Sequence, residues 1–312
     1  MSWSAEWLLS VGLLLPLTAP AQTRITSTRP AMGTPWQISC YTTDTLLAHR
    51  AIDSAFARIE AVEQSMSDYR PDSEIRTVSR LPSRQFHLVS ADLYRVLTFS
   101  RELHRYSQGA FDVTIGQLTK RWRRAIRQQV FPTEVTQGAR PQVQGITYRL
   151  HPTRGLWLAH DSLHFDLGGV AKGYALDVAG EVLGSFGIHC FLIDGGGDLL
   201  LGDAPPDRDG WTIALPDGHL DTANVAIASS GPSYRYLLHD GLRYSHLLDP
   251  RTGVGVTHSE TVTVFAPTGM LADGLASALS VRIASRVQLM KHYPRMNYIV
   301  TPSYQPSPEG AP

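Results

Sequence analysis

The chain has 312 residues, of which 43% are hydrophobic and 18% are charged, and its 28 Lys and Arg residues balance its 28 Asp and Glu residues. This composition supplies enough apolar material for a large buried core and excludes a disordered chain. The zero net charge argues against a nucleic-acid-binding protein, because that affinity depends on an excess of basic residues. The 2 cysteines exclude a disulfide-rich scaffold and a zinc site built from cysteines. The sequence leaves open whether Cys40 and Cys190 form a disulfide.

Residues 1–21 have the pattern of a cleavable export signal. The apolar run Leu8–Leu17 is too short to span a bilayer and is followed by Ala19-Pro20-Ala21, the small-x-small pattern of a signal-peptidase site. No Lys or Arg precedes the run, and Glu6 stands where a positive charge is usual, so an uncleaved anchor or a buried N-terminal helix is the alternative. We expect cleavage after Ala21 and a mature protein, without a transmembrane segment, in the periplasm or at the outer face of the inner membrane.

Apolar residues recur at helical spacing in four segments of the chain. They predict helices over 44–66, from Ser90 as N-cap to 103, over 170–186 with Gly187 as the C-terminal stop, and from about 271 to 283. The runs expected to form strands are Leu163–Phe165, Cys190–Asp194, Trp211–Leu215, Asn224–Ala228, Thr261–Phe265 and Tyr298–Thr301. Thr133–Gly145 and Asp203–Gly210 are expected to be surface loops, and the basic run Lys120–Arg127 a solvated helix face.

The order of these elements favours an α+β fold, because helices and strands mix without the regular βαβ alternation of a doubly wound sheet. No linker rich in Pro, Gly or Ser divides the chain, so residues 22–302 are expected to form one domain. Residues 303–312 are expected to form a loose C-terminal tail.

The segment Phe165–Asp177 carries the strongest signal for a ligand site. An expected strand ends at Asp166, the chain turns through Gly168 and Gly169, and a helix follows with Lys172 in its first turn. Amides at a helix start attract anions, glycines let a phosphate approach closely, and the lysine adds positive charge. The carboxylate suits a sugar, a base edge or a metal. A tight turn with a solvent-facing lysine is the structural alternative.

Two further segments carry polar groups at spacings that suit catalysis. Asp273 and Ser277 lie four residues apart, so their oxygens project from one helix face and form a partial shell for Mg²⁺. The alternative is an aspartate that complements the helix dipole. His246 lies in an expected strand that ends in the turn Asp249-Pro250, and it is a general base, a ligand-binding residue or a structural histidine. Gly195–Asp198 leads into another strand, so it is expected to be a hairpin turn and not a dinucleotide fingerprint.

An ordered set of short segments resembles the motifs of the ApbE family, the FAD:protein FMN transferases. The segments are Ala31–Thr34, Met66–Tyr69 with Asp72–Glu74, Gly109–Asp112, Asp166–Tyr174, Gly195–Asp198, Ser229–Gly231, Tyr244–Gly253, and Ala272–Asp273 with Ser277. Ser277 stands where the family has a threonine and keeps the hydroxyl group, and Ser229 replaces the first residue of the family's Thr-Ser-Gly.

The resemblance implies one large T-fold-related domain of mixed sheets and helices with a central FAD cleft. It also implies an enzyme that uses Mg²⁺ to cleave the FAD pyrophosphate, releases AMP and attaches FMN to a threonine hydroxyl of a target flavoprotein. By this similarity Asp273, Ser277 and the main-chain carbonyl of Gly169 hold the metal. His246 aligns with the family histidine that activates the acceptor hydroxyl. The residues expected to line the FAD site are Met32, Tyr69, Ala110, Phe111, Asp112, Asp166, Lys172 and Leu247.

Enzymes of this family act on FMN-binding subunits of membrane redox complexes, which makes such flavoproteins the expected partners. Two other functions fit the same residues. One is an FAD diphosphatase, which uses water as the acceptor, and the other is a flavin carrier that binds FAD without turnover. The sequence identifies neither the acceptor protein nor the oligomeric state.

Overall fold

The computed structural model describes residues 22–132, 147–161, 163–215, 218–232 and 235–302. The expected signal peptide, the expected loop Thr133–Gly145 and the expected tail at 303–312 therefore lie outside the described residues. Within the described part, no helix combines the length and the apolar character that a membrane crossing requires.

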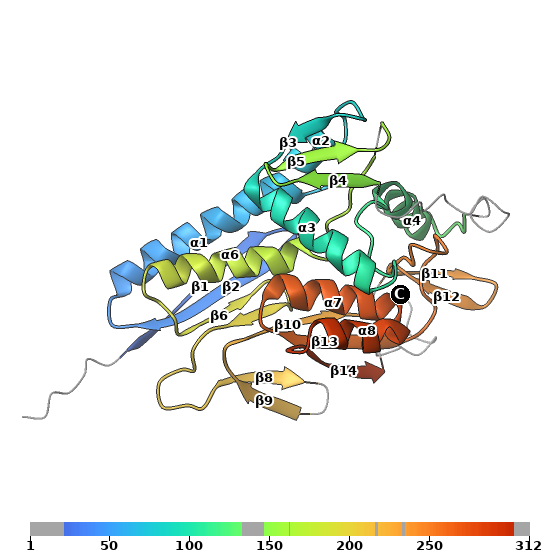
Figure 1. The fold of residues 1–312 in the computed structure, drawn as a ribbon. Helices are drawn as coiled ribbons and strands as arrows, with labels where there is room; N and C mark the ends of the chain where they lie inside the picture. The colour runs from blue at the N-terminus through green and yellow to red at the C-terminus, as the bar shows by residue number, and fades with distance from the viewer. Residues whose placement is uncertain (1–21, 133–146, 162, 216–217, 233–234, 303–312) are drawn as a thin grey trace, which may run out of the picture.

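A seven-stranded sheet forms the centre of the molecule, and its neighbouring strands are antiparallel (Figure 1). In spatial order its strands are β1 (Thr23–Ala31), β2 (Thr34–Thr42), β6 (Phe191–Asp194), β7 (Leu199–Leu201), β10 (Val225–Ser230), β13 (Glu260–Ala266) and β14 (Asn297–Pro302). Successive side chains of a strand face opposite sides of a sheet. Accordingly, Ala226 and Ala228 of β10 join the main core, whereas Ile227 joins a smaller apolar cluster with Trp211.

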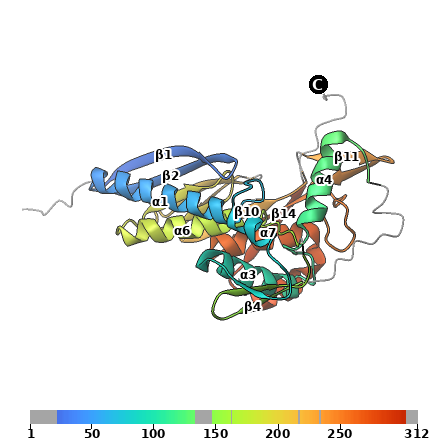
Figure 2. The ribbon, with the colours of Figure 1, turned by 90° about the horizontal axis from the view of Figure 1, so that it is seen from above.

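Helices cover one face of this sheet, and a hairpin packs on the other (Figures 1 and 2). The covering helices are α1 (Thr45–Met66), α6 (Ala171–Ser185) and α7 (Gly269–Val281), with α3 (Ala91–Tyr106) against α1 and α7. The hairpin consists of β8 (Trp211–Leu215) and β9 (Gly218–Thr222). The other elements are α2 (Glu74–Val78), β3 (Phe86–Leu88), α4 (Gly116–Gln128), β4 (Tyr148–His151), β5 (Gly155–Leu158), β11 (Tyr236–His239), β12 (Leu242–Ser245), η1 (Ile283–Ser285) and α8 (Arg286–His292).

One end of each of the first three predicted helices is confirmed by a local capping feature. The Asp44 side chain accepts a hydrogen bond from the Leu47 amide at 2.9 Å and caps α1, and Ser90 accepts one from the Leu93 amide at 3.1 Å and caps α3. Gly187 follows α6 with a φ of +74°, the left-handed conformation that a C-terminal stop requires. The predicted α+β fold is also confirmed.

The fourth predicted helix and most predicted strands are confirmed with shifted ends. α7 begins at Gly269, before the predicted start, because Thr268 accepts a hydrogen bond from the Leu271 amide at 3.3 Å and caps the helix there. The strands predicted near 190–194, 211–215, 224–228, 261–265 and 298–301 correspond to β6, β8, β10, β13 and β14. Gly195–Asp198 forms the turn between β6 and β7, as expected.

The strand predicted over Leu163–Phe165 is wrong, because this segment pairs with no strand in the described part of the chain. The carbonyl of His164 accepts a hydrogen bond from the Gly116 amide at 3.0 Å, and the Asp166 amide donates to the Val113 carbonyl at 2.8 Å. These bonds fasten the segment to the loop before α4 without forming a strand. The chain therefore enters the glycine turn from an irregular segment.

The structure also tests the expectations for the two cysteines and for one surface loop. Cys40 in β2 and Cys190 beside β6 are both free thiols, so they do not form a disulfide. Asp203–Gly210, which connects β7 to β8, contains neither helix nor strand, as expected of a loop.

The first turns of α6 and α7 meet backbone to backbone. A Cβ atom at Gly173 would lie 2.1 Å from the carbonyl oxygen of Gly269, and a Cβ atom at Gly269 would lie 2.4 Å from the carbonyl oxygen of Gly173. Both distances are far below van der Waals contact, so only glycine fits at either position. The Gly173 amide donates a hydrogen bond to Asp273 at 3.0 Å across the crossing. Lys172 of α6 is thereby placed beside Asp273 of α7.

We expect Gly173→Ala to lower the free energy of unfolding by at least about 2 kcal/mol, because the added methyl group meets main chain that yields only if the helices separate. Gly184→Ala, in the same helix, is the matched control. The nearest atom to its added Cβ lies 3.9 Å away, so the substitution fits. We expect it to raise stability by up to about 1 kcal/mol through helix propensity. Urea denaturation measures both effects, and equal effects would contradict the tight crossing.

Candidate active site

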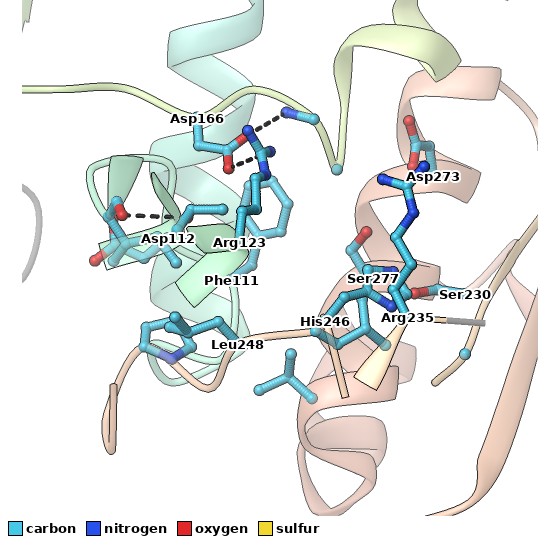
Figure 3. A pocket seen from close by; sticks show the side chains of 18 of the residues that line it. Phe111, Asp112, Arg123, Asp166, Ser230, Arg235, His246, Leu248, Asp273 and Ser277 are labelled. Carbon is cyan, nitrogen blue, oxygen red and sulfur yellow. Dashed lines mark hydrogen bonds and ion pairs between the residues drawn. The ribbon is translucent and has the colours of Figure 1, made fainter. Parts of the chain in front are cut away.

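A cleft of about 620 Å³ opens where α6 and α7 begin, and it gathers residues from distant parts of the chain (Figure 3). The predicted site residues that line it are Tyr69, Ala110, Phe111, Asp112, Asp166, Gly169, Lys172, His246, Leu247, Asp273 and Ser277. Met32 is not among the lining residues. It lies in the turn between β1 and β2, where its amide donates a hydrogen bond to Glu63 at 2.9 Å.

The glycine turn before α6 is held by the side chain of Asp166. One oxygen of this carboxylate accepts the Gly168 amide at 2.9 Å, and the other accepts a hydrogen bond from Arg123 at 2.9 Å. At Gly169 a Cβ atom would lie 2.7 Å from the Ser277 hydroxyl and 3.3 Å from the Phe111 ring. The main chain of the turn therefore passes directly against α7, where a side chain would not fit.

Lys172 is one of the cations that line the cleft. Its ammonium group forms an ion pair with Asp198, which lies in the turn between β6 and β7. Burial lowers the pKa of Lys172, but the carboxylates of Asp198 and Asp273 outweigh that effect and raise it above its ordinary value. The lysine therefore stays protonated and is not the solvent-facing residue of the structural alternative.

Asp273 and Ser277 face the cleft from one side of α7, as their spacing predicts. Burial raises the pKa of Asp273, the negative charge of Asp198 raises it further, and Lys172 opposes both effects. One oxygen of Asp273 accepts the Gly173 amide, and the other has no hydrogen-bond partner among the described residues. A carboxylate oxygen, a hydroxyl and the nearby main chain of Gly169 are oxygen donors of the kind Mg²⁺ prefers. The donor set therefore fits the predicted metal.

These donors differ from a metal site in which three or more His, Cys, Asp or Glu side chains bind the ion. Within the described ranges, no three His, Cys, Asp or Glu side chains converge as they do around zinc. A sparse set of oxygen ligands is typical of Mg²⁺ sites, where water or phosphate completes the shell.

His246 enters the cleft from the end of β12. Its amide donates to the Arg235 carbonyl at 2.8 Å, and the next amide, that of Leu247, donates to the Ser245 hydroxyl at 3.0 Å. Burial lowers the pKa of His246, and the positive charge of Arg235 lowers it further. The imidazole is therefore neutral near pH 7 and able to accept a proton.

The wall opposite α7 combines rings with a carboxylate. Asp112 accepts hydrogen bonds from the Thr114 amide at 2.8 Å and hydroxyl at 2.7 Å through one oxygen. Its second oxygen is buried without a hydrogen-bond partner in the described part of the chain. The ring of Phe111 lines the cleft beside it, and the Tyr69 side chain is 73% exposed at the rim. Flat apolar surface with one polar group suits a planar ring ligand.

Arg123 belongs to the cleft, although the basic run Lys120–Arg127 was expected to form a solvated face. That expectation holds for Arg121 and Arg124, which are exposed, and is wrong for Arg123. Its guanidinium group donates to Asp68 at 2.6 Å and to Asp166 at 2.9 Å. The helical spacing from the buried Trp122 predicts only which residues face inward. It does not predict contacts with Asp68 and Asp166, which are distant in the sequence.

One further lining residue carries no signal in the sequence analysis. Arg235 precedes β11, and its side chain lies beside His246, Ser277 and Asp273 in Figure 3. Ser230, which belongs to the motif segment Ser229–Gly231, ends β10 and lines the same side of the cleft. A single arginine in a polar segment has no spacing that would identify it before the fold is known.

A model of the ApbE family matches residues 32–300. The chain belongs to the ApbE family. Among relatives that bear the name FAD:protein FMN transferase, the protein of Vibrio cholerae (strain O395) is 32% identical over 292 residues, which cover 88% of this chain and 87% of the relative. The protein of Escherichia coli (strain K12) is 27% identical over 289 residues, which cover 84% of this chain and 80% of the relative.

Solved ApbE structures have the same fold. The flavin transferase ApbE from Vibrio cholerae matches with a TM-score of 0.73 and 27% identity, over 89% of this chain and 93% of that one. The apo form of Pseudomonas stutzeri flavinyl transferase ApbE matches with a TM-score of 0.77 and 24% identity, over 91% of this chain and 95% of that one. The second likeness bears on the fold alone.

Asp177 fixes the start of α7 in this ApbE chain. From α6 it accepts hydrogen bonds from the amides of Gly269 at 2.5 Å and Met270 at 2.9 Å. The carboxylate thus caps the helix that carries Asp273. Burial raises the pKa of Asp177 from 3.8 to about 6, against the effect of these two hydrogen bonds.

The raised pKa of Asp177 gives stability a pH dependence of defined sign. Between the unfolded value of 3.8 and the folded value of about 6, the folded state binds more protons, so the free energy of unfolding falls as pH rises. Relative to Asp177→Asn, we expect the wild-type free energy of unfolding to fall by on the order of 3 kcal/mol from about pH 4 to about pH 7. Urea denaturation of both proteins measures this; a difference independent of pH would exclude the shift.

Proposed function

We propose that this chain transfers FMN from FAD to a threonine hydroxyl of a target flavoprotein, releases AMP and requires Mg²⁺. Its relatives bear the name FAD:protein FMN transferase, and the chain is, like them, a transferase. The observation that carries the proposal is the crossing of α6 and α7, which sets Lys172 beside Asp273 and brings the glycine turn against Ser277.

The charges of the cleft suit the diphosphate of FAD. Lys172 supplies a protonated amine, and its carboxylate neighbours keep it so. When bound by Asp273, Ser277 and the carbonyl of Gly169, Mg²⁺ supplies positive charge that polarises the phosphate oxygens. The glycine turn lets the phosphates approach the main chain closely. The protein's task in phosphoryl transfer is this positioning and neutralisation.

In the transfer step, the threonine oxygen forms a bond to the phosphorus of the FMN half. The bond between that phosphorus and the bridging oxygen breaks, and AMP leaves with the bridging oxygen. His246 accepts the proton of the threonine hydroxyl, which its lowered pKa permits because the ring is neutral near pH 7. A positioned general base contributes about 10²–10⁴-fold to the rate.

The acceptors we propose are FMN-binding subunits of membrane redox complexes. The signal-peptide pattern of residues 1–21 supports action outside the cytoplasm.

One incubation separates the three candidate functions. The protein that begins at Gln22 is mixed with FAD, Mg²⁺ and a candidate FMN-binding domain, and all products are analysed by mass spectrometry. A mass increase of one FMN on an acceptor threonine, with AMP released, supports transfer. Free FMN and AMP without an adduct indicate an FAD diphosphatase, and bound, unchanged FAD indicates a carrier. Either of these results would overturn the proposal.

Asp273→Ala should abolish Mg²⁺-dependent transfer, because the metal loses its carboxylate ligand. The fold should persist at lower stability, since alanine suits a helix interior but leaves the Gly173 amide without its acceptor. Asp209→Ala, in the exposed loop before β8, is the control and should behave as wild type. FMN transfer is titrated against Mg²⁺, with circular dichroism as the check of folding. A wild-type response to Mg²⁺ in Asp273→Ala would remove the metal assignment.

His246→Ala should lower kcat for transfer by about 10²–10⁴-fold while the Kd for FAD changes by less than about threefold. Transfer kinetics and flavin fluorescence quenching measure the two quantities separately. The wild-type rate should persist below pH 6.5, the ordinary imidazole pKa, because the His246 pKa is lowered. Equal losses of rate and FAD affinity would identify His246 as a binding residue instead of a base.

A further inference from the structure

α4 stands between the two sides of the active-site cleft. Trp122 and Ala125 of α4 form a small apolar cluster with Leu237 of β11 and with Leu248, two residues after His246. The main core, which contains Phe165 and its neighbours before the glycine turn, is a separate cluster. Figure 2 shows α4 beside β11, at the end of the molecule opposite β1 and β2. The side that carries His246 therefore has a core of its own.

Trp122 ties α4 to the histidine side of the cleft. Its indole nitrogen donates a hydrogen bond to the carbonyl of Ser245 at 2.7 Å, and only 1% of the residue is exposed. Ser245 directly precedes His246 and ends β12. The position of the imidazole is therefore coupled to the position of α4.

Arg123, the next residue, ties α4 to the opposite side of the cleft. Successive helix residues project about 100° apart, so neighbouring residues on one helix can contact different walls of the cleft. The Arg123 guanidinium reaches Asp166 in the glycine turn and Asp68 in the turn after α1, and it lies over the Tyr69 ring at 5.0 Å. Figure 3 shows the bond to Asp166 on the wall that faces His246. One side chain thus joins three segments that are distant in the sequence.

We propose that Arg123 is a positioning residue for the transfer reaction, which clamps the nucleotide-binding turn to α4 and so sets its distance from His246. The proposal rests on the proposed function, because it assigns His246 and the glycine turn to two ends of one reacting complex. The pair Trp122–Arg123 acts as a two-sided link. Its first member holds the base, and its second member holds the turn that receives the phosphates. A misplacement of about 1 Å between such groups can cost 10²-fold in rate.

Arg123→Met is the test, because methionine keeps the apolar stem and removes both hydrogen bonds. We expect kcat for FMN transfer to fall about 10- to 100-fold and the KM for FAD to change by less than about threefold. Arg124→Met, one position further on the exposed side of α4, is the matched control and should retain wild-type kinetics. Wild-type kinetics of Arg123→Met, or a loss confined to KM, would overturn the proposal.

Two more variants separate positioning from charge balance. Lysine carries the charge but cannot bridge two carboxylates as a planar guanidinium does, so Arg123→Lys should recover only part of the lost rate. If Arg123 served only to offset the repulsion between Asp68 and Asp166, the double variant Arg123→Met with Asp68→Asn would recover the wild-type rate. Our proposal requires the double variant to remain slow, because the clamp is still absent.

Hydrogen–deuterium exchange tests the clamp without any turnover. In Arg123→Met, amides in 67–73 and 166–170 should exchange faster than in wild type, whereas Arg124→Met should leave them unchanged. Unchanged exchange in Arg123→Met would refute the clamp. If the wild-type protein fails to transfer FMN but the exchange result is obtained, the proposed function fails and the structural link stands.

Discussion

Gly173 and Gly269 allow α6 and α7 to start in backbone contact, and the chemistry of the cleft depends on this contact. A side chain at either position would separate the helices, and Lys172 would move away from Asp273. Asp177 reinforces the crossing, because it accepts the first amides of α7 from within α6. Two helix starts, about a hundred residues apart in the chain, are thus held as one rigid unit around the place where phosphate and metal would meet.

In the proposed reaction, the electrostatics of the cleft would couple the binding of metal and substrate. Burial and Asp198 make the ionised form of Asp273 unfavourable, although Lys172 offsets part of this effect. A divalent cation would favour the ionised form, and the diphosphate of FAD would in turn balance the added positive charge. Each of the two therefore improves the site for the other.

The parts of the structure that depend on near neighbours in sequence could be predicted, and those that depend on distant partners could not. Helix starts at Asp44 and Ser90 follow from a side chain and an amide three residues later. The facing oxygens of Asp273 and Ser277 follow from helix geometry. In contrast, Arg123 faces the cleft because of carboxylates 55 and 43 residues away, and Leu163–Phe165 has a strand-like composition but pairs with no strand among the described residues. Such positions are determined by tertiary contacts, which cannot be inferred from the spacing of residues in the sequence.

The separate apolar cluster that contains Leu248 has a consequence for how substitutions act on the cleft. Trp122, Leu237 and Leu248 pack with one another and not with the main core, so a substitution there would disturb the wall that carries His246 and leave the main core packed. At the crossing of α6 and α7 the constraint is stricter, since Gly173 and Gly269 leave no room for a side chain. A change in the small cluster therefore acts on the position of the histidine, whereas a change at the crossing acts on the positions of the lysine and the aspartate.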